Sequence, residues 1–329
     1  MCVIFFYANS NPGPAGYKLI LASNRDEFFE RKTQTAAKWA NAEHVYGGID
    51  MEPGREGGTW LAIGGKNGIY KIGALLNLTG EPKPRNAIAH NIYLHCNNNK
   101  LKIGVPLTIT KSTTTTKSKL HNEHFLLGRG MIVADFVNST YDSYIDKYNQ
   151  DLVSDCAKYT AFNFVSIEIG DPTKPASILH CSNVPPSITK FDEGLCYGFG
   201  NSLPETPFQK VHYGRKRFEE IVNNLVKTQN KMDPKMFKTT QEKLIEDLFE
   251  LLKCKRKFWP DVELNRRAPN WGEYLSALNV SVDDESYGSR THTIILIDNN
   301  DVMHFIEETM AGNDPDGEWI KTHIEKNIV

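Results

Sequence analysis

The sequence lacks long apolar runs, an excess of charge of one sign and any strong compositional bias. Its longest apolar stretch is residues 1–8, whereas a membrane-spanning helix needs roughly 18 apolar residues. The 38 basic and 40 acidic residues give a net charge of -2, which excludes the basic surface of a general nucleic-acid binder. The 24 glycines and 16 prolines exclude collagen and low-complexity chains. We therefore expect a globular protein without a transmembrane segment.

Signals for disulfides, secretion and metal binding are also missing. The 6 cysteines include no C-x-x-C pair, and the turn residues Asn9 and Pro12 follow the first apolar run too closely for a secretory signal. We expect reduced thiols and a cytoplasmic protein. Histidines and cysteines show no zinc-site spacing, and we find no phosphate-binding loop, dinucleotide fingerprint or G-x-S-x-G motif. The sequence selects no metal ligand and predicts no catalytic cofactor.

Short apolar segments bounded by turn residues predict strands. The first four are 2–8, 17–23, 59–64 and 72–78, and their order suggests an antiparallel meander. Later strands are expected at 162–169, 176–181 and 196–199, with a closing hairpin at 293–298 and 302–307. The first and last hairpins are strongly apolar, so we expect them at the centre of the fold.

Helical spacing of apolar residues appears between these strands. Phe218, Ile221, Val222 and Leu225 follow the i, i+3, i+4, i+7 pattern, and residues 244–252 repeat it. A shorter helix is expected at 130–137. The stretches 108–118 and 255–288 are polar or rich in charge, and we interpret them as irregular insertions in one domain spanning 1–329. Strands, then helices, then strands predict an α+β fold with antiparallel sheets covered by helices.

Cys2 has two interpretations. If Met1 is removed, the thiol lies beside a free α-amine, whose ordinary pKa of about 7.7–8.0 lets it act as a general base. A thiol with its own base is an activated nucleophile. Alternatively, Cys2 is a small buried residue that begins a strand.

Several other polar residues follow apolar strands. Asn24, Arg25, Asp26 and Glu27 follow the strand at 17–23, where they either reach a cleft or form a solvated strand end. Asp26 would hold the terminal amine or orient the thiol, and Arg25 would bind a carboxylate or phosphate.

Three more residues have the same double interpretation. Asn201, between Gly200 and Ser202, and Asn77, at a strand end, serve either as oxyanion donors or as turn residues. Arg290 precedes the strand at 293–298 and would face the same cleft as Asp26 if their strands are neighbours.

An ordered set of short motifs resembles the NRDE family, also called the transport and Golgi organisation protein 2 family. They are the start Met-Cys-Val-Ile-Phe-Phe, Asn-Arg-Asp-Glu at 24–27, Asp-Met-Glu at 50–52, Glu-Gly-Gly-Thr-Trp-Leu at 56–61, Gly-Asn-Ser at 200–202, Glu-Thr-Pro-Phe at 205–208 and Ser-Arg-Thr-His-Thr-Ile-Ile-Leu at 289–296. Residues 88–126 and 255–286 look longer than the family pattern.

The resemblance implies a fold like that of the N-terminal-nucleophile hydrolases, a four-layer αββα sandwich of two antiparallel sheets. By analogy with cysteine amidases of that class, Cys2, Asp26, Asn201 and Arg290 would be catalytic residues. Arg25 departs from the amidase pattern, because their arginine lies a few residues before the aspartate. A fold shared with enzymes does not establish an activity.

The family resemblance also implies handling of haem, Golgi organisation and lipid or acyl-CoA metabolism. It favours an intracellular haem carrier that mobilises haem from storage organelles or mitochondria, with transient contact with organelle membranes or haem exporters. Ligand-binding residues would be Cys2, Asn24, Arg25, Asp26, Asn77 and Arg290. The alternatives are an N-terminal cysteine amide hydrolase acting on acyl amides and an acyl-CoA or lipid binder. The expected location is the cytoplasm, in association with mitochondria, Golgi or lysosome-related organelles.

Overall fold

The computed structural model describes residues 1–80, 93–97, 100–102, 127–139, 144–171, 173–229 and 236–327. The predicted loop at 108–118 lies outside these residues. The described strands form two sheets, of seven and nine strands. The first has the order β12 (Cys196–Phe199), β1 (Val3–Ala8), β2 (Tyr17–Phe28), β14 (Tyr287–Asp298), β15 (Val302–Met310) and β16 (Trp319–Asn327), with β13 (Ser281–Val282) paired to β14.

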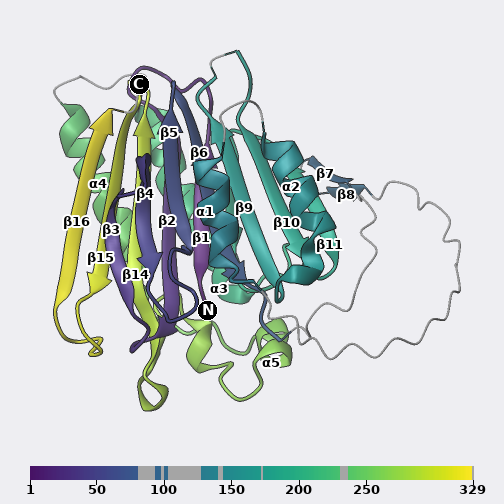
Figure 1. The fold of residues 1–329 in the computed structure, drawn as a ribbon. Coiled ribbons are helices and arrows are strands. Elements are labelled where there is room, and N and C mark those ends of the chain that lie inside the picture. The colour runs from purple at the N-terminus through teal and green to yellow at the C-terminus, as the bar shows by residue number, and fades with distance from the viewer. Residues whose placement is uncertain are drawn as a thin grey trace, which may run out of the picture.

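The second sheet stacks against the first, with strands that run in roughly the same direction (Figure 1). Its order is β3 (Thr33–Trp39), β4 (Ala42–Asp50), β5 (Leu61–Lys66), β6 (Ile69–Asn77), β9 (Phe162–Ile169), β10 (Ser177–Asn183), β11 (Pro186–Phe191), β7 (Tyr93–Asn97) and β8 (Lys100–Lys102). Neighbouring strands pair antiparallel in both sheets, except that β11 and β7 pair parallel.

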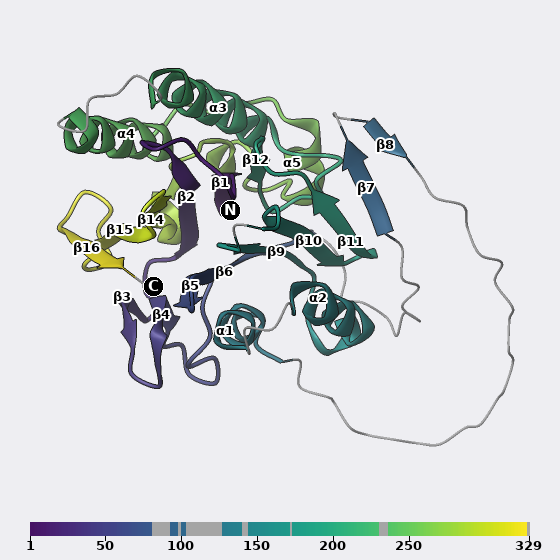
Figure 2. The same ribbon diagram turned by 90° about the horizontal axis from the view of Figure 1, so that it is seen from above.

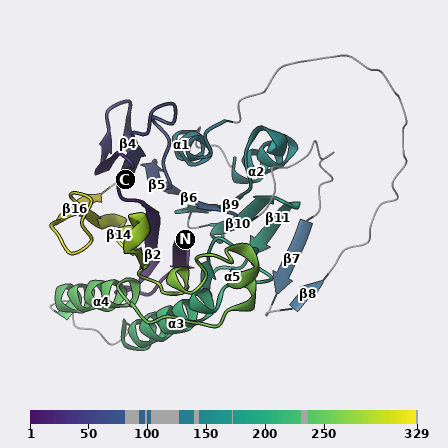
Figure 3. The same ribbon diagram turned by 90° about the horizontal axis from the view of Figure 1, so that it is seen from below.

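Helices cover the outer face of each sheet (Figure 2). The helices α3 (Gln209–Gln229) and α4 (Phe237–Leu252) pack on the first sheet, and α1 (Gly130–Asn138) and α2 (Ile145–Ser154) pack on the second. The short helix α5 (Val262–Arg267) and the 3₁₀ turns Tyr274–Ser276 and Asp283–Glu285 lie within the segment that we expected to be irregular. A further 3₁₀ turn, Cys156–Lys158, follows α2. Viewed from below, α5 lies beside the N-terminus (Figure 3).

Strand alternation explains why the molecule has several layers. In β1, Phe5 packs into the core beneath α3 and α4, whereas its neighbour Phe6 packs into the core between the sheets. In β9, Val165 joins the core between the sheets and Phe164 joins the core beneath α1 and α2. Because successive side chains point to opposite faces, apolar strands of this kind require a covering layer on each face. The predicted α+β fold with two antiparallel sheets between helical layers is confirmed.

The predicted meander is wrong. β1 and β2 form a hairpin in the first sheet, and β5 and β6 form a hairpin in the second. The other edge of β2 pairs with β14, so it is not available to β5. The hydrophobic pattern identifies a strand but not the sheet that it joins, which explains the error. The two most apolar hairpins do lie together at the centre of the first sheet, as predicted.

Asn24, Arg25, Asp26 and Glu27 lie within a strand and not after one, which corrects the expectation. β2 continues to Phe28, because Asp26 pairs with Ser289 of β14 and Arg25 pairs with Thr291. The register shifts between these two pairs, so Arg290 lies in a β-bulge. Alternation then sends Asn24 and Asp26 toward the helices and Arg25 toward the second sheet. The four consecutive polar residues therefore face two different layers of the molecule.

Candidate functional site

A cavity of about 530 Å³ opens at the end of the sandwich where β1 begins. Its walls come from both sheets and from the loop before α1. Nine charged side chains line it: Arg25, Asp26, Glu27, Arg31, Asp50, Glu52, Arg55, Glu56 and Arg129. Cys2, Trp60, Asn77 and Met131 also lie on its wall. Its volume falls within the roughly 300–1,000 Å³ of small-molecule sites, and its lining is more polar than most.

Cys2 is partly buried at the inner wall of this cavity. Its Sγ lies 3.4 Å from the backbone nitrogen of Asp26, which donates a hydrogen bond to the sulfur. Burial raises the pKa of the Cys2 thiol, although the ammonium group of Met1 acts in the opposite direction. In the chain that carries Met1, the sulfur is therefore a neutral thiol near neutral pH and not an activated thiolate.

The start of the chain forms a buried charged cluster directly behind Cys2. The ammonium nitrogen of Met1 lies 2.9 Å from Oδ2 of Asp26 and donates to the hydroxyl oxygen of Tyr287 at 2.7 Å. Oδ1 of Asp26 accepts a hydrogen bond from the Ser289 hydroxyl at 2.6 Å. The fully buried ammonium of Lys210 donates to the carbonyl oxygens of Met1 and Ala277. These contacts fix the position of the first peptide and satisfy most of its polar groups.

Arg25 is the arginine best placed to receive an anion. Its side chain is buried, and its guanidinium carbon lies 4.2 Å from the centre of the Trp60 ring. Nη1 of Arg25 has no hydrogen-bond partner among the described residues. Burial lowers the pKa of Arg25, and the carboxylate of Glu27 partly offsets this effect. A buried donor without a partner costs about 1–3 kcal/mol, so an anion that accepts from it would be bound favourably.

Two other cavity arginines already hold protein partners. Arg31 forms a two-point pair with Asp50, at 2.6 Å through Nη2 and 3.2 Å through Nε. Nη1 of Arg129 donates to the carbonyl oxygen of Ala161 at 2.8 Å. Burial, followed by the nearby charge of Arg55, lowers the pKa of Arg129 to about 10. The cavity wall thus carries four arginines and five carboxylates, and Arg25 differs from Arg31 and Arg129 in retaining an unsatisfied donor.

A second, apolar cavity of about 330 Å³ lies on the other side of Met1. Phe28, Trp271, Leu275 and Tyr287 line it together with the Met1 side chain. The hydroxyl of Tyr287 receives the Met1 ammonium, which in turn contacts Asp26 on the wall of the polar cavity. A polar site and an apolar site are thus separated by the first residue of the chain.

The structure divides the candidate residues from the sequence into two groups. Cys2, Arg25, Asp26 and Asn77 line the polar cavity. Asn24, Asn201 and Arg290 do not belong to its wall.

The second group has other contacts. Asn24 is buried under α4, where its amide donates to the carbonyl oxygens of Leu252 and Leu278. Arg290 donates to the carbonyl oxygens of Phe28 and Arg31, so it braces the turn after β2. The backbone of Asn201 accepts a hydrogen bond from Thr79 at 3.0 Å, and its Oδ1 has no partner among the described residues.

Sequence reasoning missed several contributors to the site. Tyr287 lies within the segment 255–288 that suggested irregular chain, and Ser289 was recognised only as the first residue of the motif at 289–296. Lys210 lies at the start of α3 and carries no motif that marks it as buried. Trp60 and Arg129 come from two segments far apart in the chain. One signal was present for Trp60, because it belongs to the motif at 56–61 that supported the family resemblance.

The fold and site define an α+β protein of two stacked sheets, with a cysteine-centred polar cavity at the start of its first strand. Residues 1–92 and 94–312 match the family described as Transport and Golgi organisation 2. The chain is 54% identical to Transport and Golgi organization protein 2 of Drosophila melanogaster, over 100% of this chain and 99% of that protein. It is 28% identical to the homologues of Mus musculus and Homo sapiens, over 95% of each chain. The chain belongs to this family.

The relatives' names refer to transport and to Golgi organisation. Within the described ranges, no helix combines the length and the hydropathy needed to cross a bilayer.

Proposed function

We propose that this chain is a haem carrier that binds the porphyrin at the two cavities flanking Met1. One observation carries the proposal: a buried Arg25 with an unpartnered Nη1 lies beside the thiol of Cys2. Haem combines carboxylate groups with an apolar ring, so it needs a cationic receptor next to apolar walls. Arg25 in the polar cavity supplies the cationic receptor, and the Trp60 ring and the apolar cavity behind Met1 supply the apolar walls.

The roles of the residues follow from their contacts. Arg25 would donate charge-assisted hydrogen bonds to a propionate, whereas Arg31 remains paired with Asp50. Cys2 would offer its sulfur to the iron, which requires loss of the thiol proton. Because burial raises the pKa of that thiol, a proton would compete with the iron for the sulfur, which suits a carrier that must release its cargo. Loading would occur during transient contact with an organelle membrane or an exporter.

The experiment measures haem binding from the Soret absorption and haem transfer from loaded membranes to an apo-acceptor. Arg25→Gln should weaken binding roughly 10- to 100-fold, the range for about 1.5–3 kcal/mol in one charged hydrogen bond. Cys2→Ala should shift the Soret band and keep part of the transfer. Arg217→Gln, on the exposed face of α3, is the matched control and should behave as the wild type. Equal binding by Arg25→Gln and the control would refute the proposed site.

An amide hydrolase is the second candidate, and the buried cluster at Met1 favours it. If Met1 is removed, the new α-amine of Cys2 lies beside Asp26, and the carbonyl that Lys210 holds is lost. The amine would take the thiol proton while Sγ attacks the amide carbonyl carbon. Its ammonium would then protonate the departing amine, and water would release the acid from the thioester. Asn77, on the cavity wall, is the asparagine best placed to stabilise the oxyanion.

Removal of Met1 would also join the polar and apolar cavities, so the expected substrate is an acyl amide with a polar head. Mass spectrometry of the protein purified from cells determines which N-terminus it carries. The processed protein should hydrolyse long-chain acyl amides, and Cys2→Ala should abolish hydrolysis without changing the melting temperature appreciably. Retention of Met1 in the cellular protein would end this hypothesis.

A further inference from the structure

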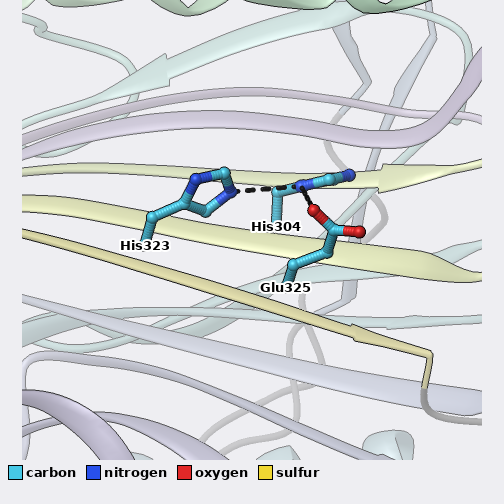
Figure 4. Close-up of side chains that lie close together, drawn as sticks. All are labelled: His304, His323 and Glu325. Carbon is cyan, nitrogen blue, oxygen red and sulfur yellow. Dashed lines mark hydrogen bonds and ion pairs between the residues drawn. The ribbon is translucent and has the colours of Figure 1, made fainter.

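A group of metal-binding side chains lies on the outer hairpin of the first sheet, away from the cavities at Met1. It consists of His304 on β15 and His323 and Glu325 on β16 (Figure 4). None of the three lines either cavity. No local motif in the sequence marks the group, because the two histidines are 19 positions apart. No zinc-site spacing of the helical or loop type is present.

Strand register explains why the three side chains meet. His304 lies directly opposite Glu325, and His323 is the next residue on the same face of β16. Opposed residues on antiparallel strands have Cβ atoms about 4.5–5.5 Å apart, close enough for their side chains to share one ligand. The face is fixed by packing, because Ile306, two residues from His304, points into the core beneath the helices. The intervening Phe305 and its partner Ile324 point toward the core between the sheets.

The distances match those around one metal ion. Nδ1 of His304 lies 3.2 Å from Nε2 of His323 and 3.7 Å from Oε2 of Glu325. Ligands at about 2.0–2.2 Å from a tetrahedral ion are roughly 3.4 Å from one another. The three ligand atoms all lie within 4.8 Å of one another. Small rotations of the exposed side chains of His323 and Glu325 would therefore bring all three ligand atoms to bonding distance.

We propose that His304, His323 and Glu325 bind one zinc-class divalent transition metal ion. Two imidazoles and one carboxylate suit zinc, copper or nickel, whereas magnesium and calcium prefer ligand sets made of oxygen atoms only. Three protein ligands leave a fourth position for water or an external ligand.

The environment of His304 supports this assignment. Its side chain is buried, and burial lowers the pKa of the ring, an effect that the carboxylate of Glu325 opposes. A lower pKa favours the neutral imidazole, which is the form that coordinates a metal. The other two ligands are exposed and movable, which gives an ion a path to the site.

A metal ion bound by this group would stabilise the edge of the first sheet. β16 is the edge strand of the first sheet, and within that sheet β15 is its only neighbour among the described strands. An ion shared by β15 and β16 would link this edge strand to the rest of the sheet. Metal binding should therefore stabilise the folded chain by mass action as well as occupy a surface site.

The test uses the full chain without an affinity tag, freed of metal and titrated with Zn²⁺ by calorimetry. The wild type should bind one ion per chain at this site, with a rise in melting temperature. His323→Ala, at an exposed position, should lower the affinity at least tenfold and abolish the thermal shift. Glu325→Gln keeps the side-chain shape and removes the charge, so it should weaken binding. His212→Ala, on the exposed surface of α3, is the matched control and should bind as the wild type.

A Co²⁺ titration then identifies the ligand type. The wild-type complex should show d–d bands without a thiolate charge-transfer band, since no cysteine belongs to the group. The proposal is overturned if the wild type binds no Zn²⁺, if His323→Ala binds as tightly as the wild type, or if the Co²⁺ spectrum shows a thiolate ligand. Because the control and the variants are compared for melting temperature without metal, a folding defect is separated from a lost ligand.

Discussion

The ammonium group of Met1 lies 2.9 Å from Oδ2 of Asp26, and both groups are almost completely withdrawn from solvent. This pair lies in the layer beneath the helices, while Cys2, the next residue, faces the cavity between the sheets. The alternation of one extended chain thus separates a buried ion pair from a thiol that reaches a ligand cavity. Met1 therefore belongs to a buried ion pair and Cys2 to the cavity wall, and the two roles can be tested separately.

Loss of the Asp26 carboxylate should destabilise the protein strongly. Asp26→Ala leaves the Met1 ammonium buried without a counter-charge, and breaking a buried ion pair in this way costs about 3–5 kcal/mol. Chemical denaturation monitored by circular dichroism measures the change. The exposed pair of Lys147 and Asp151 provides the control, and Asp151→Ala should leave the unfolding midpoint unchanged. Similar midpoints for the two variants would show that the pair at Met1 contributes little.

Cys2 should react slowly with iodoacetamide in the folded chain that carries Met1. Burial raises the pKa of its thiol, so only a small fraction is thiolate at pH 7. Alkylation followed by peptide mass spectrometry should show a lower rate for Cys2 than for a free cysteine peptide. Denaturation should remove the difference. A folded-state rate equal to or above that of the peptide would contradict the neutral-thiol assignment.

His292 should make the protein lose stability in mild acid. Burial lowers the pKa of His292 to about 4, and its Nδ1 contacts Oδ1 of Asn24 at 2.7 Å. Between about pH 6.5 and that value the unfolded chain binds more protons than the folded chain, so stability falls as pH falls. The total loss from this group is up to about 3 kcal/mol across the window.

Denaturation curves at several pH values test this prediction. His292→Gln should be less stable than the wild type at pH 7 and should show a shallower dependence on pH between 6.5 and 4. His212→Gln, at an exposed position, should keep the wild-type slope. An unchanged slope in His292→Gln would mean that other groups, such as the buried His180, dominate the acid response.

The packing of α3 on β1 depends on a glycine. A Cβ at Gly214 would overlap the ring of Phe5, which is fully buried. Alanine is the better helix former by about 1 kcal/mol, so propensity alone predicts that Gly214→Ala stabilises the protein. We expect the overlap to prevail and to destabilise it by about 1–3 kcal/mol. Thermal unfolding of Gly214→Ala shows which effect prevails, and a melting temperature above that of the wild type would contradict our expectation. Gly312→Ala, in the turn between β15 and β16 where a Cβ meets open space, is the control for a glycine-to-alanine change without overlap.

Much of the strand and helix content could be predicted from local pattern. The runs that form β1, β9 and β14 are long and apolar, and the spacing around Leu248 identifies α4. β3 and β16 were missed because their exposed faces interrupt the apolar pattern. In β16 only Trp319, Thr322 and Ile324 are even partly buried, as expected for an edge strand.

The candidate site was predictable only in part, for a related reason. Cys2 and Asp26 carry motif information, and the hairpin of β1 and β2 brings them together. Tyr287 reaches the same cluster from a segment 261 residues away from Asp26, through the pairing of β14 with β2. Lys210 reaches it through the docking of α3. No local pattern encodes these encounters, because they depend on which strands share a sheet.

The sequence by itself determined the alternation of each strand, the two amphipathic helices and the thiol at the second residue. These properties depend on neighbours a few positions apart, through the fixed periods of strands and helices. Only the tertiary structure decided which layer of the molecule Asn24 and Arg25 each face, and that Met1 divides two cavities. It also decided that His304 meets His323 and Glu325. Such contacts arise from strand register and sheet order, which are set by packing across the whole chain.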